Sequence, residues 1–232
     1  MANKAKALFI AKKMFTQLVY DFQSLEGMPF TFPEVQTFIQ GITVGGHKIS
    51  DHDKLRQQQL AWEYLINLVE TDKFSVTEQT ACALNGIVAK DEALVPGVIR
   101  DGAVSVSSGD DTYHPPAPEK LPGMLRDVLA YAKHDAISIQ KRGYSLAASF
   151  VYKQFHWDGN KRTGSLMMNG LFLSNGILPC SVPAKRLQEY NALLMDLYKT
   201  GDSRPVIEFY EHCHQAIYRD WGEVWEKPQN EN

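Results

Sequence analysis

Apolar residues recur at helical spacing along most of the sequence, and this periodicity restricts the fold more than any other feature. Phe15, Leu18 and Leu25 follow one another at intervals of three and seven, which places them on one face of an amphipathic helix predicted over residues 5–26. The sequence therefore predicts an all-α fold with a helical bundle of about eight to ten helices in a single domain. Similar patterns predict the further helices over about 31–41, 50–70, 75–88, 119–134, 138–154, 161–175, 183–200 and 204–219.

Capping boxes mark two of the predicted helix starts. In such a box, an N-terminal hydroxyl side chain and an acidic residue three positions later satisfy each other's free backbone N–H groups. Thr31 with Glu34 and Ser75 with Glu78 have this spacing. We expect Thr31 and Ser75 to begin helices.

Residues 96–118 interrupt the helical pattern. Val104, Ser105 and Val106 alternate apolar and polar side chains, and the turn-forming sequence Ser-Gly-Asp-Asp follows over residues 108–111. Two consecutive prolines, at 115 and 116, then prevent a strand from continuing. The segment is therefore predicted to be one small β-hairpin.

Net charge, the length of the apolar runs and the cysteine content exclude several classes of protein. The 24 Lys and Arg residues against 27 Asp and Glu residues give a net charge of −3, so a general nucleic-acid-binding role is not expected. The apolar runs are shorter than the roughly 20 residues that a membrane span requires. The three cysteines are odd in number and widely spaced, which is typical of reduced thiols. We expect a cytoplasmic protein that binds neither nucleic acid nor membranes.

One polar stretch between two helical patterns has the composition of a phosphate site. Gly159 permits a left-handed backbone, and the helix that follows presents free N–H groups to an anion. Arg162 adds a guanidinium suited to phosphate oxygens, and Asp158 a carboxylate suited to Mg²⁺. The alternative from spacing alone is an ordinary surface turn capped by Asn160.

This stretch also resembles the active-site loop of the Fic/Doc (Fido) family, whose pattern is His-x-Phe-x-Asp/Glu-Gly-Asn-Gly-Arg-x-x-Arg. The resemblance covers roughly residues 20–212. It extends to the N-terminal region 1–50, where Leu-Glu-Gly-Met-Pro-Phe-Thr over 25–31 is similar to Fic proteins with an inhibitory glutamate. It also includes the hairpin of 96–118, as the family's flap, and the core of 138–219 with the active-site loop 154–165.

The resemblance implies a Fido fold and AMP transfer from ATP, with Mg²⁺, onto a hydroxyl side chain of a target protein. It implies that Asp158 binds the metal and that Glu26 is the inhibitory glutamate. The flap, at Val104, Ser105 and Val106, would hold the target segment. The nucleotide would be bound by residues of the loop and the following helix, namely Gly159, Asn160, Lys161, Arg162 and Ser165.

The loop departs from the family pattern at important positions. Gln154 stands at the position of the base histidine, and an amide does not titrate at neutral pH. His156 is therefore a candidate substitute base, although the family's residue there is a core Phe, and a hydrogen-bonded packing role is the alternative. Ser165 replaces the family's second Arg, so Glu26 is expected to lack its cationic partner.

Three functions follow from this pattern. The first is a protein adenylyltransferase, slow or altered because the base is replaced. The second is a catalytically inactive Fic homologue that binds a nucleotide or another protein. The third is a Doc-like phosphotransferase or an enzyme using another phosphate-containing donor, for which Lys161 is the indication. The sequence leaves a homodimer open.

Overall fold

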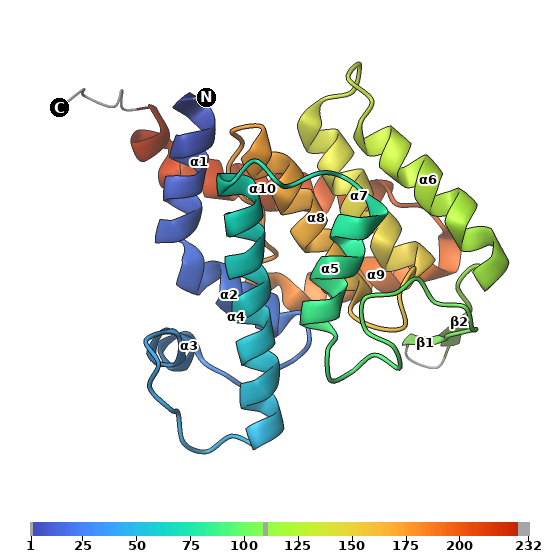
Figure 1. Cartoon of the computed structure of the whole chain (residues 1–232), viewed down its shortest axis with the longest axis horizontal. Helices are drawn as coiled ribbons and strands as arrows, with labels where there is room; N and C mark the ends of the chain where they lie inside the picture. The colour runs from blue at the N-terminus through green and yellow to red at the C-terminus, as the bar shows by residue number, and fades with distance from the viewer. Residues whose placement is uncertain (1, 109–110, 227–232) are drawn as a thin grey trace.

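The computed structural model describes residues 2–108 and 111–226 and confirms the predicted all-α fold with one small hairpin (Figure 1). The turn predicted over 108–111 includes residues 109–110, which lie outside the described part. No helix in the described ranges is long and apolar enough to cross a membrane. The α-helices are α1 (Ala2–Lys13), α2 (Phe15–Ser24), α3 (Phe32–Ile39), α4 (Ile49–Glu70), α5 (Glu78–Val88), α6 (Leu121–Ala132), α7 (Ile139–Lys153), α8 (Asn160–Ser174), α9 (Leu187–Thr200) and α10 (Arg204–Glu226).

The N-terminal helix predicted over 5–26 is two helices. The chain bends at Met14, where ψ is 0°, and α2 starts at the next residue. The reason is tertiary: α1 packs against α8, whereas α2 packs against α3 and α4. Both helices bury an apolar face, so the apolar periodicity of the sequence continues through the bend and does not reveal it.

One of the two predicted capping boxes is confirmed. The backbone N–H of Thr31 donates to Glu34 Oε2 at 2.7 Å at the start of α3. The prediction for Ser75 was wrong, because α5 begins two residues later than that cap requires. Thr77 is its N-cap, and the Thr77 hydroxyl accepts from the Thr80 N–H at 3.2 Å.

The hairpin consists of β1 (Val106–Ser108) and β2 (Asp111–Tyr113), an antiparallel pair in which Val106 lies opposite Tyr113. The strand starts at the end of the predicted alternation, so Val104 and Ser105 precede it as extended chain. These residues lead from the core into the flap at one edge of the bundle (Figure 1).

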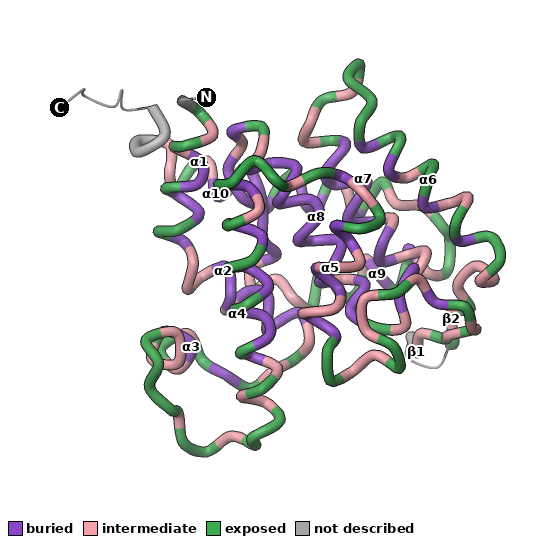
Figure 2. The backbone as a smooth tube through the Cα atoms, viewed as in Figure 1, coloured by how far each residue is buried: buried purple, intermediate pink, exposed green. Residues whose placement is uncertain are grey.

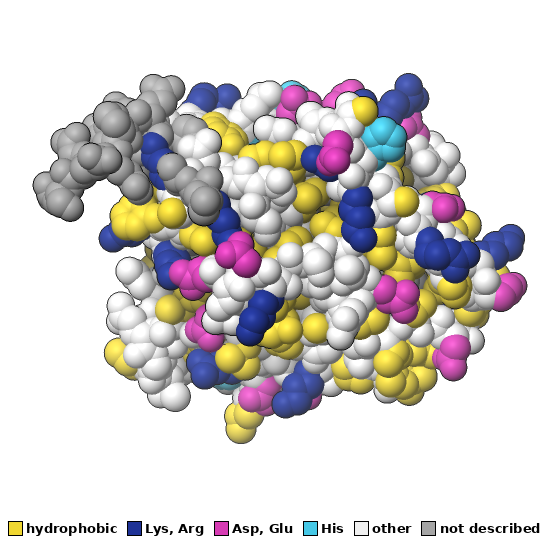
Figure 3. Space-filling model, turned by 45° about the horizontal axis from the view of Figure 1, so that its top comes forward, with side chains coloured by type: hydrophobic (Ala, Val, Ile, Leu, Met, Phe, Trp, Pro, Cys, Tyr) yellow, Lys and Arg dark blue, Asp and Glu magenta, His cyan; other side chains and the backbone are white. Residues whose placement is uncertain are grey.

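Helix α8 lies at the centre of the bundle and packs against α7, α5, α4 and α1. Figure 2 shows the buried positions concentrated in α7, α8 and the inward faces of the helices around them, while α3 and its loops are mostly exposed or intermediate. On the face shown in Figure 3, acidic and basic side chains are interspersed, as the balanced composition leads one to expect.

A glycine allows α7 and α8 to approach closely. A Cβ atom at Gly164 would lie 2.8 Å from the Cβ of Phe150 and 3.0 Å from the carbonyl oxygen of Ala147, both on α7. These distances are shorter than van der Waals contact, so the close packing of the two helices depends on the missing side chain.

We predict that Gly164→Ala lowers the free energy of unfolding by about 1–2 kcal/mol, because overpacking outweighs the gain in helix propensity. Gly222→Ala is the matched control, since nothing lies within 4 Å of a Cβ there, and it should raise stability by about 0.5–1 kcal/mol. Urea denaturation measures both. A Gly164→Ala protein as stable as the wild type would show that the two helices can separate without cost.

Candidate functional site

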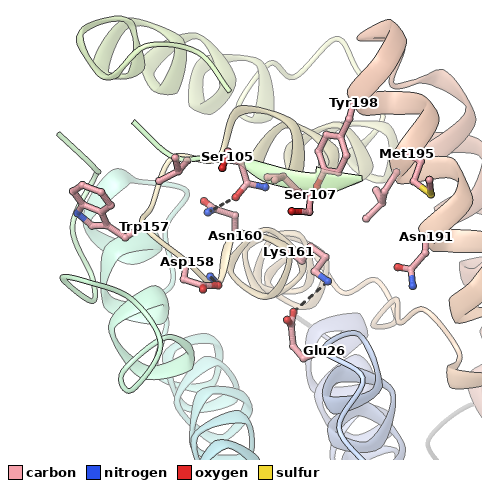
Figure 4. A pocket seen from close by; sticks show the side chains of 15 residues that line it. Glu26, Ser105, Ser107, Trp157, Asp158, Asn160, Lys161, Asn191, Met195 and Tyr198 are labelled. Atoms are coloured by element: carbon pink, nitrogen blue, oxygen red, sulfur yellow. Dashed lines mark hydrogen bonds and ion pairs between the residues drawn. The ribbon is translucent and has the colours of Figure 1, made fainter. Parts of the chain in front are cut away.

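A cavity of about 460 Å³ lies where the predicted loop, the flap and the end of α2 meet (Figure 4). The flap supplies one wall, α9 another, and the start of α8 the floor. Nine of the predicted site residues line this cavity: Glu26, Val104, Ser105, Val106, Gln154, Asp158, Gly159, Asn160 and Lys161. The other lining residues are Ser107, Trp157, Asn191, Leu194, Met195 and Tyr198.

Two left-handed residues shape the loop between α7 and α8. Gln154 ends α7 with φ 49° and ψ 63°, and Gly159 precedes α8 with φ 72°. A Cβ atom at Gly159 would lie 2.9 Å from the Cβ of Ala89, so only glycine fits both the conformation and the space. The first N–H groups of α8 have no intrahelical acceptor and are available to an anion at this end of the helix.

Asn160 holds this loop in shape. Its Oδ1 accepts from the His156 N–H at 2.9 Å, and its Nδ2 donates to the His156 carbonyl at 2.9 Å and to Gln154 Oε1 at 2.8 Å. Both polar atoms of the side-chain amide are thus hydrogen-bonded. Asn160 lines the cavity and stabilises the loop through these hydrogen bonds.

Gln154 presents no titrating group at the base position. Its Nε2 donates to the Val151 carbonyl at 2.6 Å, and its Oε1 accepts from Asn160. Both ends of the side-chain amide are therefore hydrogen-bonded, and an amide neither takes up nor releases a proton at neutral pH.

His156 lies in the core and outside the cavity wall. Its side chain is fully buried, and Nδ1 hydrogen-bonds to the Val98 carbonyl at 2.8 Å while the ring stacks against Phe150. Burial lowers the pKa of His156 to about 4. This arrangement favours the packing role over the role of substitute base.

Arg162 is also buried, contrary to a simple picture of a phosphate ligand on the cavity wall. Only 1% of the residue is exposed. Nη1 donates to the Val88 carbonyl at 2.7 Å and pairs with Glu92 Oε2 at 2.6 Å. Nε lies 3.3 Å from Glu26 Oε1, and Nη2 lies 3.5 Å from Asp158 Oδ1. Three carboxylates thus surround this guanidinium.

Ser165 is likewise buried and is not part of the cavity wall. It lies inside the bundle on α8, one turn beyond the residues that reach the cavity. Its carbonyl accepts from the Asn169 side chain at 2.9 Å. The structure therefore does not bring Arg162 and Ser165 together with the other predicted nucleotide-binding residues.

Glu26 has cationic partners, so the expectation that it would lack one was wrong. Besides Arg162, it pairs with Lys161, whose Nζ lies 3.6 Å from Glu26 Oε1 and donates to the Leu25 carbonyl at 2.9 Å. Figure 4 shows Glu26 and Lys161 facing each other across one side of the cavity. Lys161, which replaces a family glycine, supplies a partner that the family pattern does not contain.

Asp158 fits the role of a metal ligand. Its side chain is about half exposed (52%) at the cavity wall, and Oδ1 accepts from the Gly159 N–H. Mg²⁺ is usually bound by one or two carboxylates, with phosphate oxygens and water completing the shell. A single carboxylate beside a helix N-terminus therefore fits a metal ion that arrives with a nucleotide.

Sequence reasoning missed three polar residues that support the site, two of them buried and Glu92 partly buried. Asn85 on α5 is fully buried and donates to the Asp158 carbonyl at 2.8 Å and to Thr163 Oγ1 at 3.1 Å. Glu92 pairs with Arg162, and Arg100 holds the start of the flap. A polar Asn within the apolar stripe of its helix was the one available signal.

Comparisons with known proteins identify similar sequences and structures. Residues 75–172 match the family model described as Fic/DOC family. The matched stretch includes α5, the flap and the loop between α7 and α8, so the part of the chain that supplies most of the cavity's lining residues is similar to Fic/DOC proteins.

Among the curated relatives, the protein named Protein adenylyltransferase Fic in Drosophila erecta is 25% identical over 207 residues, covering 87% of this chain and 41% of the relative. Its namesake in Drosophila persimilis is 25% identical over 217 residues, covering 91% and 42%. The chain thus spans less than half the length of these relatives.

Solved Fic structures share the fold. A Fic family protein from Desulfovibrio desulfuricans superposes with a TM-score of 0.77 at 18% identity, covering 94% of this chain and 67% of that one. Fic-1 from C. elegans gives a TM-score of 0.77 at 20% identity, covering 91% and 63%.

We predict that Arg162→Ala lowers the free energy of unfolding by about 3–5 kcal/mol, because it leaves Glu26, Glu92 and Asp158 close together without their shared cation. Chemical denaturation monitored by circular dichroism measures the change. The control is Arg204→Ala, which removes an exposed ion pair with Asp202 and should change stability little. A loss of nucleotide binding at full stability would instead mean that Arg162 acts as a ligand.

Proposed function

We propose that this protein is a member of the Fic/DOC family that binds a nucleotide with Mg²⁺ in the cavity and transfers AMP to a protein hydroxyl only slowly. The observation that carries the proposal is the non-titrating amide of Gln154 at the position of the family's base, beside a loop that keeps Asp158, Gly159 and Asn160 of the family pattern at the cavity. The names of the relatives, Protein adenylyltransferase Fic, support the reaction class.

The nucleotide phosphates would lie at the start of α8. The free N–H groups of its first turn and the ammonium of Lys161 would attract them, and Asp158 would hold the metal. Lys161 is also paired with Glu26, whose carboxylate lines the same cavity. Phosphate and carboxylate therefore compete for one cation.

The target would be a protein segment carrying a hydroxyl side chain, lying along the flap. Val104, Ser105, Val106 and Ser107 form the flap side of the cavity, and the serines are exposed. The flap places main-chain groups and small polar side chains beside the reacting position. An extended target segment can pair with such a surface.

The missing base limits the rate. General base catalysis contributes roughly 10²–10⁴-fold to the rate of proton transfer reactions of this kind. A protein that binds nucleotide but lacks this contribution would be a slow transferase, or a binding protein if the hydroxyl of the target is never deprotonated. The two cases are separated by restoring the base.

We predict that Gln154→His raises the rate of AMP transfer at least tenfold, because an imidazole then replaces the amide. Wild type and variant would be incubated with Mg-ATP and lysate proteins, and intact-mass spectrometry would detect the added AMP. Gln188→His, at an exposed position on α9, is the matched control. ATP binding without any adduct in either protein would identify a binding protein, whereas the addition of phosphate would indicate the Doc-like reaction.

We predict that Glu26→Gln raises the affinity for Mg-ATP about tenfold, because it removes a negative charge from the phosphate side of the cavity and frees Lys161. Isothermal titration calorimetry measures the dissociation constant. Glu119→Gln, an exposed residue before α6, should leave the affinity unchanged. Weaker binding in Glu26→Gln would mean that the carboxylate supports the site by holding its cations in place.

A further inference from the structure

Arg100 is a buried cation whose side chain contacts three main-chain carbonyls. Only 2% of the residue is exposed. Nε donates to the Gln154 carbonyl at 2.6 Å, Nη1 to the Gly102 carbonyl at 2.7 Å, and Nη2 to the Pro116 carbonyl at 2.6 Å. The three acceptors belong to three different segments of the chain, and Gln154 is the one that lines the cavity.

The three acceptors lie at the active-site loop and at the two ends of the flap. Gln154 is the base position, Gly102 lies where the chain enters the flap, and Pro116 lies where the chain leaves it. One guanidinium therefore joins both ends of the flap to the active-site loop. In Figure 4, Ser105 and Ser107 of the flap lie above Asn160 and Asp158 of the loop.

Backbone contacts align the same two segments. The Arg100 N–H donates to the Phe155 carbonyl at 2.9 Å, and Ile99 forms an isolated antiparallel bridge with His156. The His156 ring adds its bond to the Val98 carbonyl. Residues 98–100 thus run beside the loop, and the buried His156 has its own role in this contact.

The charge of Arg100 is not neutralised by a nearby acid. In the ranges that the structure describes, no carboxylate forms an ion pair with it, and burial lowers its pKa. Burying a cation whose partners are all carbonyl groups costs free energy of folding. A lysine could not replace it, because an ammonium on a single stem cannot reach three carbonyls that diverge as the guanidinium fork does.

The second strand of the flap has a further attachment at its last residue, Tyr113. The Tyr113 hydroxyl donates to the Tyr152 carbonyl at 2.9 Å, and the Tyr113 ring stacks between Tyr152 and Tyr198, at centroid distances of 5.1 and 4.8 Å. Tyr198 itself lines the cavity. The flap is therefore fixed both at its base and at the end of its second strand.

We propose that Arg100 is a positioning residue that fixes the flap at one distance and orientation from the active-site loop. It keeps the left-handed Gln154 in place through its carbonyl and holds both ends of the flap against it. The effect of Arg100 on nucleotide affinity rests on the proposed function, whereas its effect on the position of the flap relative to the loop does not.

The test is hydrogen–deuterium exchange with mass spectrometry on the nucleotide-free protein, in wild type, Arg100→Lys and the exposed control Arg126→Lys. We expect Arg100→Lys to speed exchange at least tenfold in residues 102–107, 112–116 and 154–160 together, with α1 and α4 unchanged. Unchanged exchange in the flap, or equal acceleration throughout the molecule, would overturn the proposal.

Two further measurements test the role of Arg100, one by chemical rescue and one by nucleotide affinity. Arg100→Ala provides a second variant, and low millimolar methylguanidinium should restore slow exchange in its flap and loop, whereas methylammonium should not. The affinity for Mg-ATP should fall at least tenfold in Arg100→Lys. If wild type binds no nucleotide, the proposed function fails, but the exchange data still decide the role of Arg100.

Discussion

The buried guanidinium of Arg162 is the interaction on which the rest of the site depends. It joins the end of α2 through Glu26, the segment after α5 through Glu92, and the active-site loop through Asp158. Lys54 and Lys161 add two more cations to the same carboxylates. Because each charge has a partner of opposite sign, the cluster can be buried, and the loop is held by ion pairs from elements far apart in the sequence.

The two buried arginines differ in what they contact. Arg162 is neutralised by carboxylates, whereas Arg100 contacts only carbonyls. The N-terminus of α8 favours an anion at the cavity, whereas Glu26 and Asp158 add two negative charges to its wall. Binding of phosphate there belongs to the proposed function.

The Fic fold surrounds a loop that carries the amide of Gln154 where the resemblance implies a base histidine. Asn160, Gly159 and Asn85 still fix the loop at the start of α8, and the flap still forms the opposite wall. Within this loop Gln154 offers an amide to the cavity and His156 is turned into the core.

The sequence by itself determined the local structure: most helix positions, the Thr31 cap, the place of the hairpin and the loop between α7 and α8. These depend on residues within a few positions of one another, which periodicity and capping chemistry detect. Tertiary structure decided the bend at Met14, the burial of Arg162, the partners of Glu26 and the contacts of Arg100. Those outcomes depend on contacts such as Lys161 with Leu25 and Arg162 with Val88, which are 136 and 74 residues apart and leave no local signal.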